Sequence, residues 1–305
     1  MIASLDEFKA DFEAFDFDVT VPKFTQEMTE DQLCEMIGGF DGWIIGDDPA
    51  SRAVVATGVN GRLKACMRWG VGTNNVDFDA FKEFNIPIAN TPGVFGREVA
   101  DIACHYVTAL ARNTYHIDQK VKAGDWYKPV GTSLWAQSAL IVGMGDVGQQ
   151  LSKRLYAHDI EVTYHDPYVK NLPADINATK VTWPYAAALA DFLIFTAPLT
   201  EQTYHIFNEA LLDTVKPGIK IINVGRGPLI DEQALVKGLK EGIISAAALD
   251  VLEKEPIDLE LHKSLLAFSD RLILGSHNGS NTFEAVSHVS RLCIRKLHQF
   301  LQNGI

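Results

Sequence analysis

Short apolar, β-branched runs alternate with amphipathic helical patterns along the second half of this chain, and this alternation limits the fold more than any other feature. Such runs occur at Ala139–Val142, Glu161–Tyr164, Phe192–Thr196, Lys220–Val224, Ser245–Leu249 and Leu272–Leu274. After the first run, Val147, Leu151 and Leu155 recur every fourth residue and share one helix face. Strands that alternate with helices form right-handed βαβ units. The pattern therefore predicts a parallel sheet with helices on both faces.

A shorter alternation of the same kind lies before residue 100. It predicts strands at Trp43–Gly46, Leu63–Met67 and Ile86–Ala89, with helices at Thr29–Ile37 and Phe78–Phe84. One long helical pattern, 97–123, joins the two halves, and the amphipathic stretch 283–303 can pack back on the first half. We therefore expect an α/β protein with two Rossmann-like domains, each a doubly wound parallel sheet. The smaller domain is discontinuous (1–97 plus 281–305), and the larger domain spans 98–280.

Composition and charge exclude several classes of protein. The 305 residues are enough for two domains, and 39 acidic against 27 basic residues give a formal charge of −12. Such a surface repels nucleic acid and anionic membranes. Cys34, Cys66, Cys104 and Cys293 show no metal-ligand spacing, which favours a reducing compartment. No apolar run approaches the ~18 residues of a membrane span, and the early acidic residues do not suit a signal peptide. We expect a cytoplasmic protein with no metal site, no nucleic-acid partner and no membrane contact.

The strongest local motif is a glycine-rich turn, Gly143-Met144-Gly145-Asp146-Val147-Gly148, which directly follows a predicted strand and opens a helix. The first glycine permits a tight turn, the second lets the backbone approach a pyrophosphate, and the third allows the helix to pack closely on the strand. The free amides around Asp146 and Val147 can bind the anion at the helix start. The Asp146 carboxylate is an unfavourable neighbour for that anion.

A second part of the dinucleotide fingerprint follows the next predicted strand. Asp166 lies 21 residues after Gly145 (166 − 145), close to the expected spacing of ~20. Its carboxylate can accept hydrogen bonds from both ribose hydroxyls and repels a 2′-phosphate, and no arginine follows it directly, so NAD is favoured over NADP. The alternative is that Asp166 only caps a turn before Pro167.

Three further polar residues each come just after a predicted strand: Arg226, then Glu255 before Pro256, then His277. In this order behind the glycine motif, they resemble the D-isomer-specific 2-hydroxyacid dehydrogenase family. Other segments also resemble motifs of that family: Gly70–Asp77, Asn90–Gly93 and Ala197–Thr200. The resemblance covers about residues 40 to 300.

The resemblance implies an oxidoreductase that transfers a hydride between carbon 2 of a small D-2-hydroxy acid and NAD. His277 would be the acid/base, because imidazole titrates near neutral pH. Glu255 would orient the ring and favour its protonated form, and Arg226 would hold the substrate carboxylate and polarise the carbonyl. The Val71 and Gly72 amides would hold the other side of the carboxylate. Further residues implied near the cofactor are Pro198, Val224, Gly225, Asp250 and Gly279. Relatives are usually homodimers, and the long helix from Arg97 is a candidate face.

Two departures from the family pattern flank the histidine: Ser276 replaces a proline and Asn278 an apolar residue. The family also opens on a strand, whereas this chain begins with a helical pattern, and its end at Ile305 leaves no room for an appended regulatory domain. The alternatives to an enzyme are a nucleotide-sensing corepressor and a relative that has lost activity.

Two segments of the sequence bear on the identity of the substrate. The stretch 122–134 most resembles 3-phosphoglycerate dehydrogenases, for which Arg68 and Arg52 are candidate phosphate ligands. However, Gly46-Asp47-Asp48-Pro49 is acidic where some of these enzymes have an arginine. The sequence therefore favours 3-phosphoglycerate or a glycerate-like acid.

Overall fold

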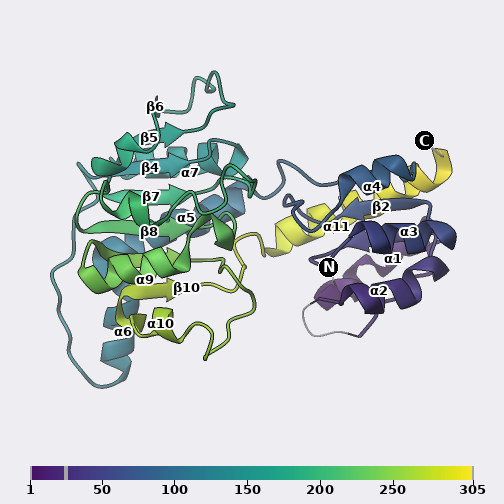
Figure 1. Ribbon diagram of the computed structural model, residues 1–305, viewed down its shortest axis with the longest axis horizontal. Helices are drawn as coiled ribbons and strands as arrows, with labels where there is room; N and C mark the ends of the chain where they lie inside the picture. Colours follow the sequence, from purple (N-terminus) through teal and green to yellow (C-terminus); the bar gives the residue numbers. More distant parts are fainter. Residues whose placement is uncertain (1, 24–26, 304–305) are drawn as a thin grey trace. The chain divides into compact units, whose positions relative to one another are not determined.

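The computed structural model describes residues 2–23 and 27–303, and the chain divides into two compact units (Figure 1). The larger unit is Gly96–Ser280, and the smaller unit joins Met1–Phe95 to Asn281–Ile305. The first boundary therefore lies at Phe95 rather than at the expected residue 97. Each unit is described by itself.

The larger unit is built on a seven-stranded parallel sheet with the order β10-β9-β8-β7-β4-β5-β6 (Figure 1). Its strands are β4 (Ser138–Val142), β5 (Glu161–His165), β6 (Thr179–Lys180), β7 (Phe192–Phe195), β8 (Ile219–Asn223), β9 (Ile244–Leu249) and β10 (Leu272–Leu274). All but the short edge strand β6 match runs predicted from the sequence. The strand order reverses between β4 and β7, and ligands of such sheets bind at the carboxyl ends of the strands at this reversal.

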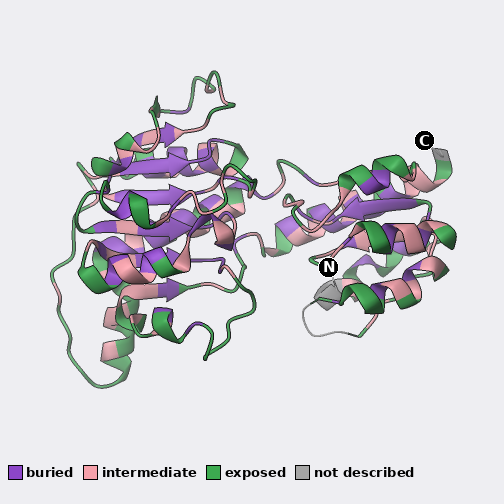
Figure 2. Ribbon diagram, in the orientation of Figure 1, coloured by how far each residue is buried: buried purple, intermediate pink, exposed green. Residues whose placement is uncertain are grey.

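Both faces of this sheet are buried, which explains the continuous apolar runs in its strands (Figure 2). In β4, Leu140 and Val142 belong to one apolar cluster, while Ala139 and Ile141 belong to the cluster on the opposite face. The first cluster includes residues of α8 (Glu209–Leu212) and α9 (Glu232–Glu241), and the second includes residues of α5 (Gly96–Arg112) and α7 (Asp146–Ala157). The shorter helical elements are η3 (Tyr185–Ala188), η4 (Gly227–Leu229), α10 (Lys263–Leu266) and η5 (Ser269–Arg271).

The prediction of one long helix over 97–123 is wrong. Helix α5 ends at Arg112, and α6 (Thr114–Lys122) begins two residues later. Between them, Asn113 has φ +54°, in the left-handed region that asparagine tolerates better than most residues and that a right-handed helix cannot include. The apolar side of α5 packs inside the larger unit, with Ala100, Ala103 and Val107 fully buried.

The smaller unit has a parallel sheet of three strands in the order β1-β2-β3, formed by Gly42–Ile45, Ala65–Arg68 and Ile88–Ala89. The C-terminal helix α11 (Phe283–Asn303) contacts β1 and β2, and its Ile294 packs with Phe8 and Phe12. The sheet is therefore covered by a segment from the far end of the chain. The remaining elements are η1 (Ile2–Phe8), α1 (Lys9–Glu13), α2 (Glu30–Met36), η2 (Ile37–Gly39), α3 (Arg52–Asn60) and α4 (Phe78–Glu83). Within residues 2–23 and 27–303, no helix is both long and apolar enough to cross a membrane.

Candidate active site

The loop after β4 forms a cradle for a phosphate group. Gly143 has φ +99°, and a Cβ at this position would lie 2.6 Å from the backbone nitrogen of Ala197, in the segment that leaves β7. The Thr196 hydroxyl donates a hydrogen bond to the Gly143 carbonyl at 2.6 Å, which ties together the two strands at the reversal. Gly145 faces open space, and α7 begins at the next residue. The first amides of α7 are thus accessible to an anion.

Asp166 follows β5 and accepts hydrogen bonds from one backbone amide of the cradle and from two amides of its own loop. Its Oδ2 accepts a hydrogen bond from Met144 at 2.8 Å, and its Oδ1 accepts from Tyr168 at 2.8 Å and from Val169 at 3.0 Å. The carboxylate therefore caps the turn that contains Pro167 and also anchors the glycine loop. Because a carboxylate has about four lone-pair sites, one remains for a ribose hydroxyl.

The Asp146 side chain lies at the start of two helices. It is the first residue of α7, and its Oδ2 would be 2.1 Å from a Cβ on Gly96, the first residue of α5. Gly96 therefore makes room for the carboxylate. A helix N-terminus stabilises a nearby negative charge, and the Asp146 carboxylate lies at the N-terminus of α5. The same carboxylate remains close to the glycine loop.

His277 and Glu255 form a pair at the carboxyl end of the sheet. His277 Nδ1 lies 2.8 Å from Glu255 Oε2, and Glu255 Oε1 accepts a hydrogen bond from the Leu252 amide at 2.9 Å. The other ring nitrogen, Nε2, makes no hydrogen bond to any residue in the described part of the chain. Burial raises the pKa of Glu255, but the hydrogen bond and charge of His277, the Leu252 amide and the charge of Arg226 outweigh it, so its pKa lies below the ordinary value. The carboxylate is thus ionised at neutral pH and fixes one side of the ring.

The backbone of His277 is held in an unusual conformation by Asp250. His277 has φ +56°, and its amide donates to the Asp250 carbonyl at 2.7 Å. The Asp250 side chain is only 4% exposed and accepts hydrogen bonds from the Gly279 amide at 2.8 Å, the Asn278 amide at 3.3 Å and the Tyr106 hydroxyl at 3.4 Å. Burial raises the pKa of Tyr106, and the Asp250 charge raises it further. Asp250 thereby orders the loop that presents the histidine.

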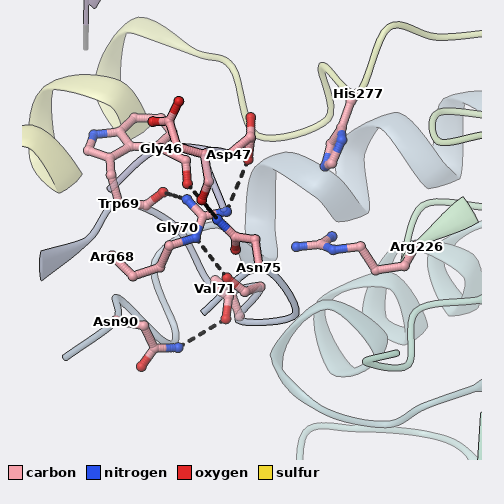
Figure 3. A network of polar contacts seen from close by, with 12 residues as sticks. Gly46, Asp47, Arg68, Trp69, Gly70, Val71, Asn75, Asn90, Arg226 and His277 are labelled. Carbon is pink, nitrogen blue, oxygen red and sulfur yellow. Dashed lines mark hydrogen bonds and ion pairs between the residues drawn. The ribbon is translucent and has the colours of Figure 1, made fainter. Parts of the chain in front are cut away.

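Arg226 lies on the loop after β8, which the buried side chain of Asn223 orders. Asn223 Nδ2 donates to the Arg226 carbonyl at 2.9 Å, and Asn223 Oδ1 accepts from the Gly225 amide at 3.0 Å. A Cβ on Gly227 would lie 1.7 Å from the Leu252 carbonyl oxygen, so this loop rests directly on the segment that leads to Glu255. Figure 3 shows the Arg226 guanidinium and the His277 ring in the same region of the larger unit.

In the smaller unit, the loop after β2 presents two amides with free hydrogen-bonding capacity. Gly70 has φ +133° and donates to the Thr91 hydroxyl at 3.1 Å, and the Val71 carbonyl accepts from Asn90 Nδ2 at 2.9 Å (Figure 3). Neither the Val71 nor the Gly72 amide donates a hydrogen bond to a residue within the ranges that the structure describes. Successive free backbone amides are suited to binding an anion such as a carboxylate.

The structure places both candidate phosphate ligands in ion pairs, Arg68 with Asp47 and Arg52 with Glu83, and only Arg68 is buried. Arg68 is 6% exposed, and its guanidinium donates to the Gly72 carbonyl, the Trp69 carbonyl and Asp47 (Figure 3). Arg52 pairs with the Glu83 carboxylate. The sequence pattern does not reveal the two carboxylates, because Asp47 is 21 residues from Arg68 and Glu83 is 31 residues from Arg52.

Comparison with known proteins decides the family. The family model described as D-isomer specific 2-hydroxyacid dehydrogenase, NAD binding domain, matches residues 104–279, more than half of the chain. This chain belongs to the D-isomer specific 2-hydroxyacid dehydrogenase family. The matched residues lie within the larger unit, so this unit is the NAD-binding domain of the dehydrogenase. The open glycine cradle and the remaining acceptor site of Asp166 fit that cofactor.

The relatives of this chain are named for different substrates. D-3-phosphoglycerate dehydrogenase 3 of Arabidopsis thaliana is 35% identical over 274 residues, which are 87% of this chain but 45% of the plant protein, so the chain spans less than half of that relative. Hydroxypyruvate reductase of Thermotoga maritima is 31% identical, covering 91% of this chain and 90% of that protein. The crystal structure of a glyoxylate reductase from Paecilomyes thermophila superposes with a TM-score of 0.84 at 27% identity, covering 97% and 92% of the two chains.

At several positions the structure shows hydrogen bonds that the sequence pattern does not predict. The Gly279 amide donates a hydrogen bond to the Asp250 carboxylate at 2.8 Å, and the expectation that both residues lie near the nicotinamide stays a prediction. Glu253, which the sequence could confuse with Glu255, pairs with His205 at 2.9 Å. Asn223 was not singled out, although a polar residue at the end of the apolar run Lys220–Val224 is a recognisable signal of a buried, hydrogen-bonded side chain.

Other expected cofactor residues lie around the cradle. Pro198 follows β7, and its carbonyl accepts a hydrogen bond from the Thr203 hydroxyl at 2.7 Å. The Val224 amide donates to the Phe195 carbonyl at 3.1 Å, which places the Val224–Gly225 backbone beside the end of β7. Val147 and Gly148 lie in the first turn of α7, with Gly148 packed against the Gly143 carbonyl. These residues therefore border the strand-order reversal where the cofactor of this fold binds.

Proposed function

We propose that this protein interconverts a small D-2-hydroxy acid and the corresponding 2-oxo acid, with His277 as the acid/base. The observation that carries this proposal is the His277–Glu255 pair, in which Nδ1 is bound at 2.8 Å and Nε2 is left for a substrate. A carboxylate that fixes one ring nitrogen and leaves the other available is the arrangement that general acid/base catalysis by histidine requires.

In the oxidation direction, the substrate loses the hydroxyl proton and a hydride from carbon 2. NAD, when bound, accepts the hydride. His277 Nε2 takes the hydroxyl proton, and the Glu255 carboxylate stabilises the positive charge that then develops on the ring. In the reduction direction, the same nitrogen returns the proton to the carbonyl oxygen. The planar fork of Arg226 binds the substrate carboxylate and polarises the carbonyl, and the free Val71 and Gly72 amides supply further donors for the carboxylate.

The substrate we propose belongs to the glycerate class of short 2-hydroxy acids. The names of the relatives support this range, since they include a phosphoglycerate dehydrogenase, a hydroxypyruvate reductase and a glyoxylate reductase. The sequence alone left both 3-phosphoglycerate and an unphosphorylated glycerate-like acid open.

An enzyme is better supported than a relative that has lost activity. The substitutions Ser276 and Asn278 leave His277 in contact with Glu255 and its amide bound to Asp250. A corepressor-like binding protein is the remaining alternative, and turnover separates it from an enzyme.

We also propose that the protein is a cytoplasmic homodimer. The four cysteines are free thiols, as expected in a reducing compartment. Large apolar side chains are exposed on α6 and in the segment after it, at Tyr115, Val121, Trp126, Val130 and Trp135. Because so much exposed apolar surface is unusual for a monomer, we place the dimer contact here rather than on α5. Light scattering should give twice the mass of one chain.

The test of the proposed activity is NADH-dependent reduction of glyoxylate, hydroxypyruvate, 3-phosphohydroxypyruvate and pyruvate, together with oxidation of the D- and L-hydroxy acids. His277→Ala should lower kcat by roughly 10²–10⁴-fold while the affinity for NADH, measured by fluorescence, stays close to that of the wild type. His158→Ala is the matched control, because His158 is an exposed residue at the end of α7. Normal turnover in His277→Ala refutes the assignment of the acid/base.

A further inference from the structure

We propose that Asp47, held beside the Gly70–Gly72 loop by Arg68, makes this enzyme select 2-oxo acids that carry no negative charge other than their carboxylate. Hydroxypyruvate and glyoxylate then belong to the substrate class, and the phosphorylated three-carbon acid does not. This inference rests on the proposed function, in which the Val71 and Gly72 amides bind the substrate carboxylate.

The Arg68 guanidinium, a positive charge that could bind a substrate phosphate, is already occupied by other groups of the chain. Arg68 comes directly before the loop, but its guanidinium lies beneath it and is hydrogen-bonded to three parts of the chain (Figure 3). Nε donates to the Gly72 carbonyl at 2.9 Å, one terminal nitrogen donates to the Trp69 carbonyl, and the other donates to Asp47 Oδ1 at 3.1 Å. Since the side chain is also almost fully buried, a phosphate would have to break these bonds to reach it.

The exposed charge beside the Gly70–Gly72 loop is the carboxylate of Asp47. The Asp47 side chain is 61% exposed, and Arg68 contacts it through Oδ1. Asp48, the next residue, is buried and accepts a hydrogen bond from the Met28 amide at 2.9 Å. Asp47 and Asp48 thus place two carboxylates near the single guanidinium of Arg68. Of these three charged side chains, only that of Asp47 is exposed, so the accessible charge next to the loop is negative. A second anionic group on a substrate held by this loop meets repulsion from Asp47.

Arg68 holds Asp47 and the Gly70–Gly72 loop together. Arg68 is hydrogen-bonded to both the Gly72 carbonyl and the Asp47 carboxylate. It therefore holds in place the loop that binds the substrate carboxylate and the acidic residue that repels a negatively charged group at the other end of the substrate. Asn75 adds to this rigidity, because its Nδ2 donates to the carbonyls of Gly46 and Asp48 on either side of Asp47. Arg68 is thus a positioning residue, and Asp47 is the residue that determines specificity.

The experiment compares kcat/KM for hydroxypyruvate and 3-phosphohydroxypyruvate at saturating NADH. We expect the wild type to prefer hydroxypyruvate by at least ~100-fold, and Asp47→Asn to reduce this ratio about tenfold. Asparagine keeps an oxygen that can accept from Arg68, so the loop is preserved while the charge is removed. Asp41→Asn is the matched control: Asp41 has the same charge but pairs with Arg62 and Lys64, and its removal should leave the ratio unchanged. Added salt should favour the phosphorylated substrate more in the wild type than in Asp47→Asn.

Comparable turnover of the two substrates by the wild type overturns the inference, as does an unchanged ratio in a folded Asp47→Asn. If that variant does not fold, Asp47→Ser is measured in the same way. If no acid tested, glyoxylate and pyruvate included, is turned over, the proposed function fails, and the inference is then decided by calorimetry with NAD present. Binding of 3-phospho-D-glycerate as tight as that of D-glycerate overturns it, whereas weaker binding supports it.

Discussion

Replacing Glu255 by glutamine tests how the His277 ring is controlled. The carboxylate accepts hydrogen bonds on both oxygens, from His277 Nδ1 at 2.8 Å and from the Leu252 amide at 2.9 Å. An amide side chain has one acceptor and one donor end. If its oxygen faces Leu252, its NH₂ faces Nδ1, and the proton is forced onto Nε2, where it blocks the base. If its oxygen faces the ring, its NH₂ opposes the Leu252 amide.

The size of the effect follows from the loss of one charge-assisted hydrogen bond. Such bonds contribute about 1.5–3 kcal/mol, and the two side chains are 38% and 31% exposed, so solvent screening favours the lower end of this range. Since about 1.4 kcal/mol corresponds to tenfold in rate, kcat should fall roughly 10- to 100-fold. The effect on KM should be small, because Glu255 is not proposed to touch the substrate.

Steady-state oxidation of D-glycerate by NAD measures this effect, because His277 acts as the base in that direction. Glu253→Gln is the matched control, since Glu253 lies two residues away and pairs with a different histidine, His205, at 2.9 Å. Its kcat should stay within about twofold of the wild type. A Glu255→Gln variant with wild-type kcat refutes the positioning role, and an equal loss in both variants shows that the effect is not specific to His277.

Three further predictions concern stability and cofactor binding. Because the pKa of Glu255 in the folded chain lies below its ordinary value of 4.5, its stabilising contribution is complete above pH 4.5 and is lost as the pH falls through the folded value. The free energies of unfolding of wild type and Glu255→Gln, measured in urea, should therefore differ at neutral pH and converge in acid, and a constant difference contradicts this. Asp146→Asn should bind NADH about two- to fivefold more tightly in a fluorescence titration, because a negative charge beside the pyrophosphate site is removed; unchanged or weaker binding argues against this. Gly227→Ala should lower the free energy of unfolding by about 1–3 kcal/mol, since the new Cβ would lie 1.7 Å from the Leu252 oxygen, and an unaltered thermal midpoint shows that the loop can move.

Much of the fold could be predicted because its signals are local. The apolar runs of the larger unit correspond to buried strands, and the glycine motif follows β4 and opens α7 as expected. The order Arg226, Glu255 and His277 also identified a pair that the structure brings within 2.8 Å. By contrast, the helix break at Asn113 was missed, because a single left-handed residue leaves the helical periodicity on either side almost intact.

The sequence by itself therefore determined the architecture, the cofactor class and the residues that carry the proposed chemistry, since each depends on residue type and spacing along the chain. Only the tertiary structure decided which partner each charged group has. Arg68, a candidate phosphate ligand in the sequence, is paired with Asp47, which lies 21 residues away. Asp250 supports the histidine loop through Gly279, a residue distant from it in the sequence. A buried charge must be paired or hydrogen-bonded, and folding brings those partners from separate segments whose proximity no local pattern records.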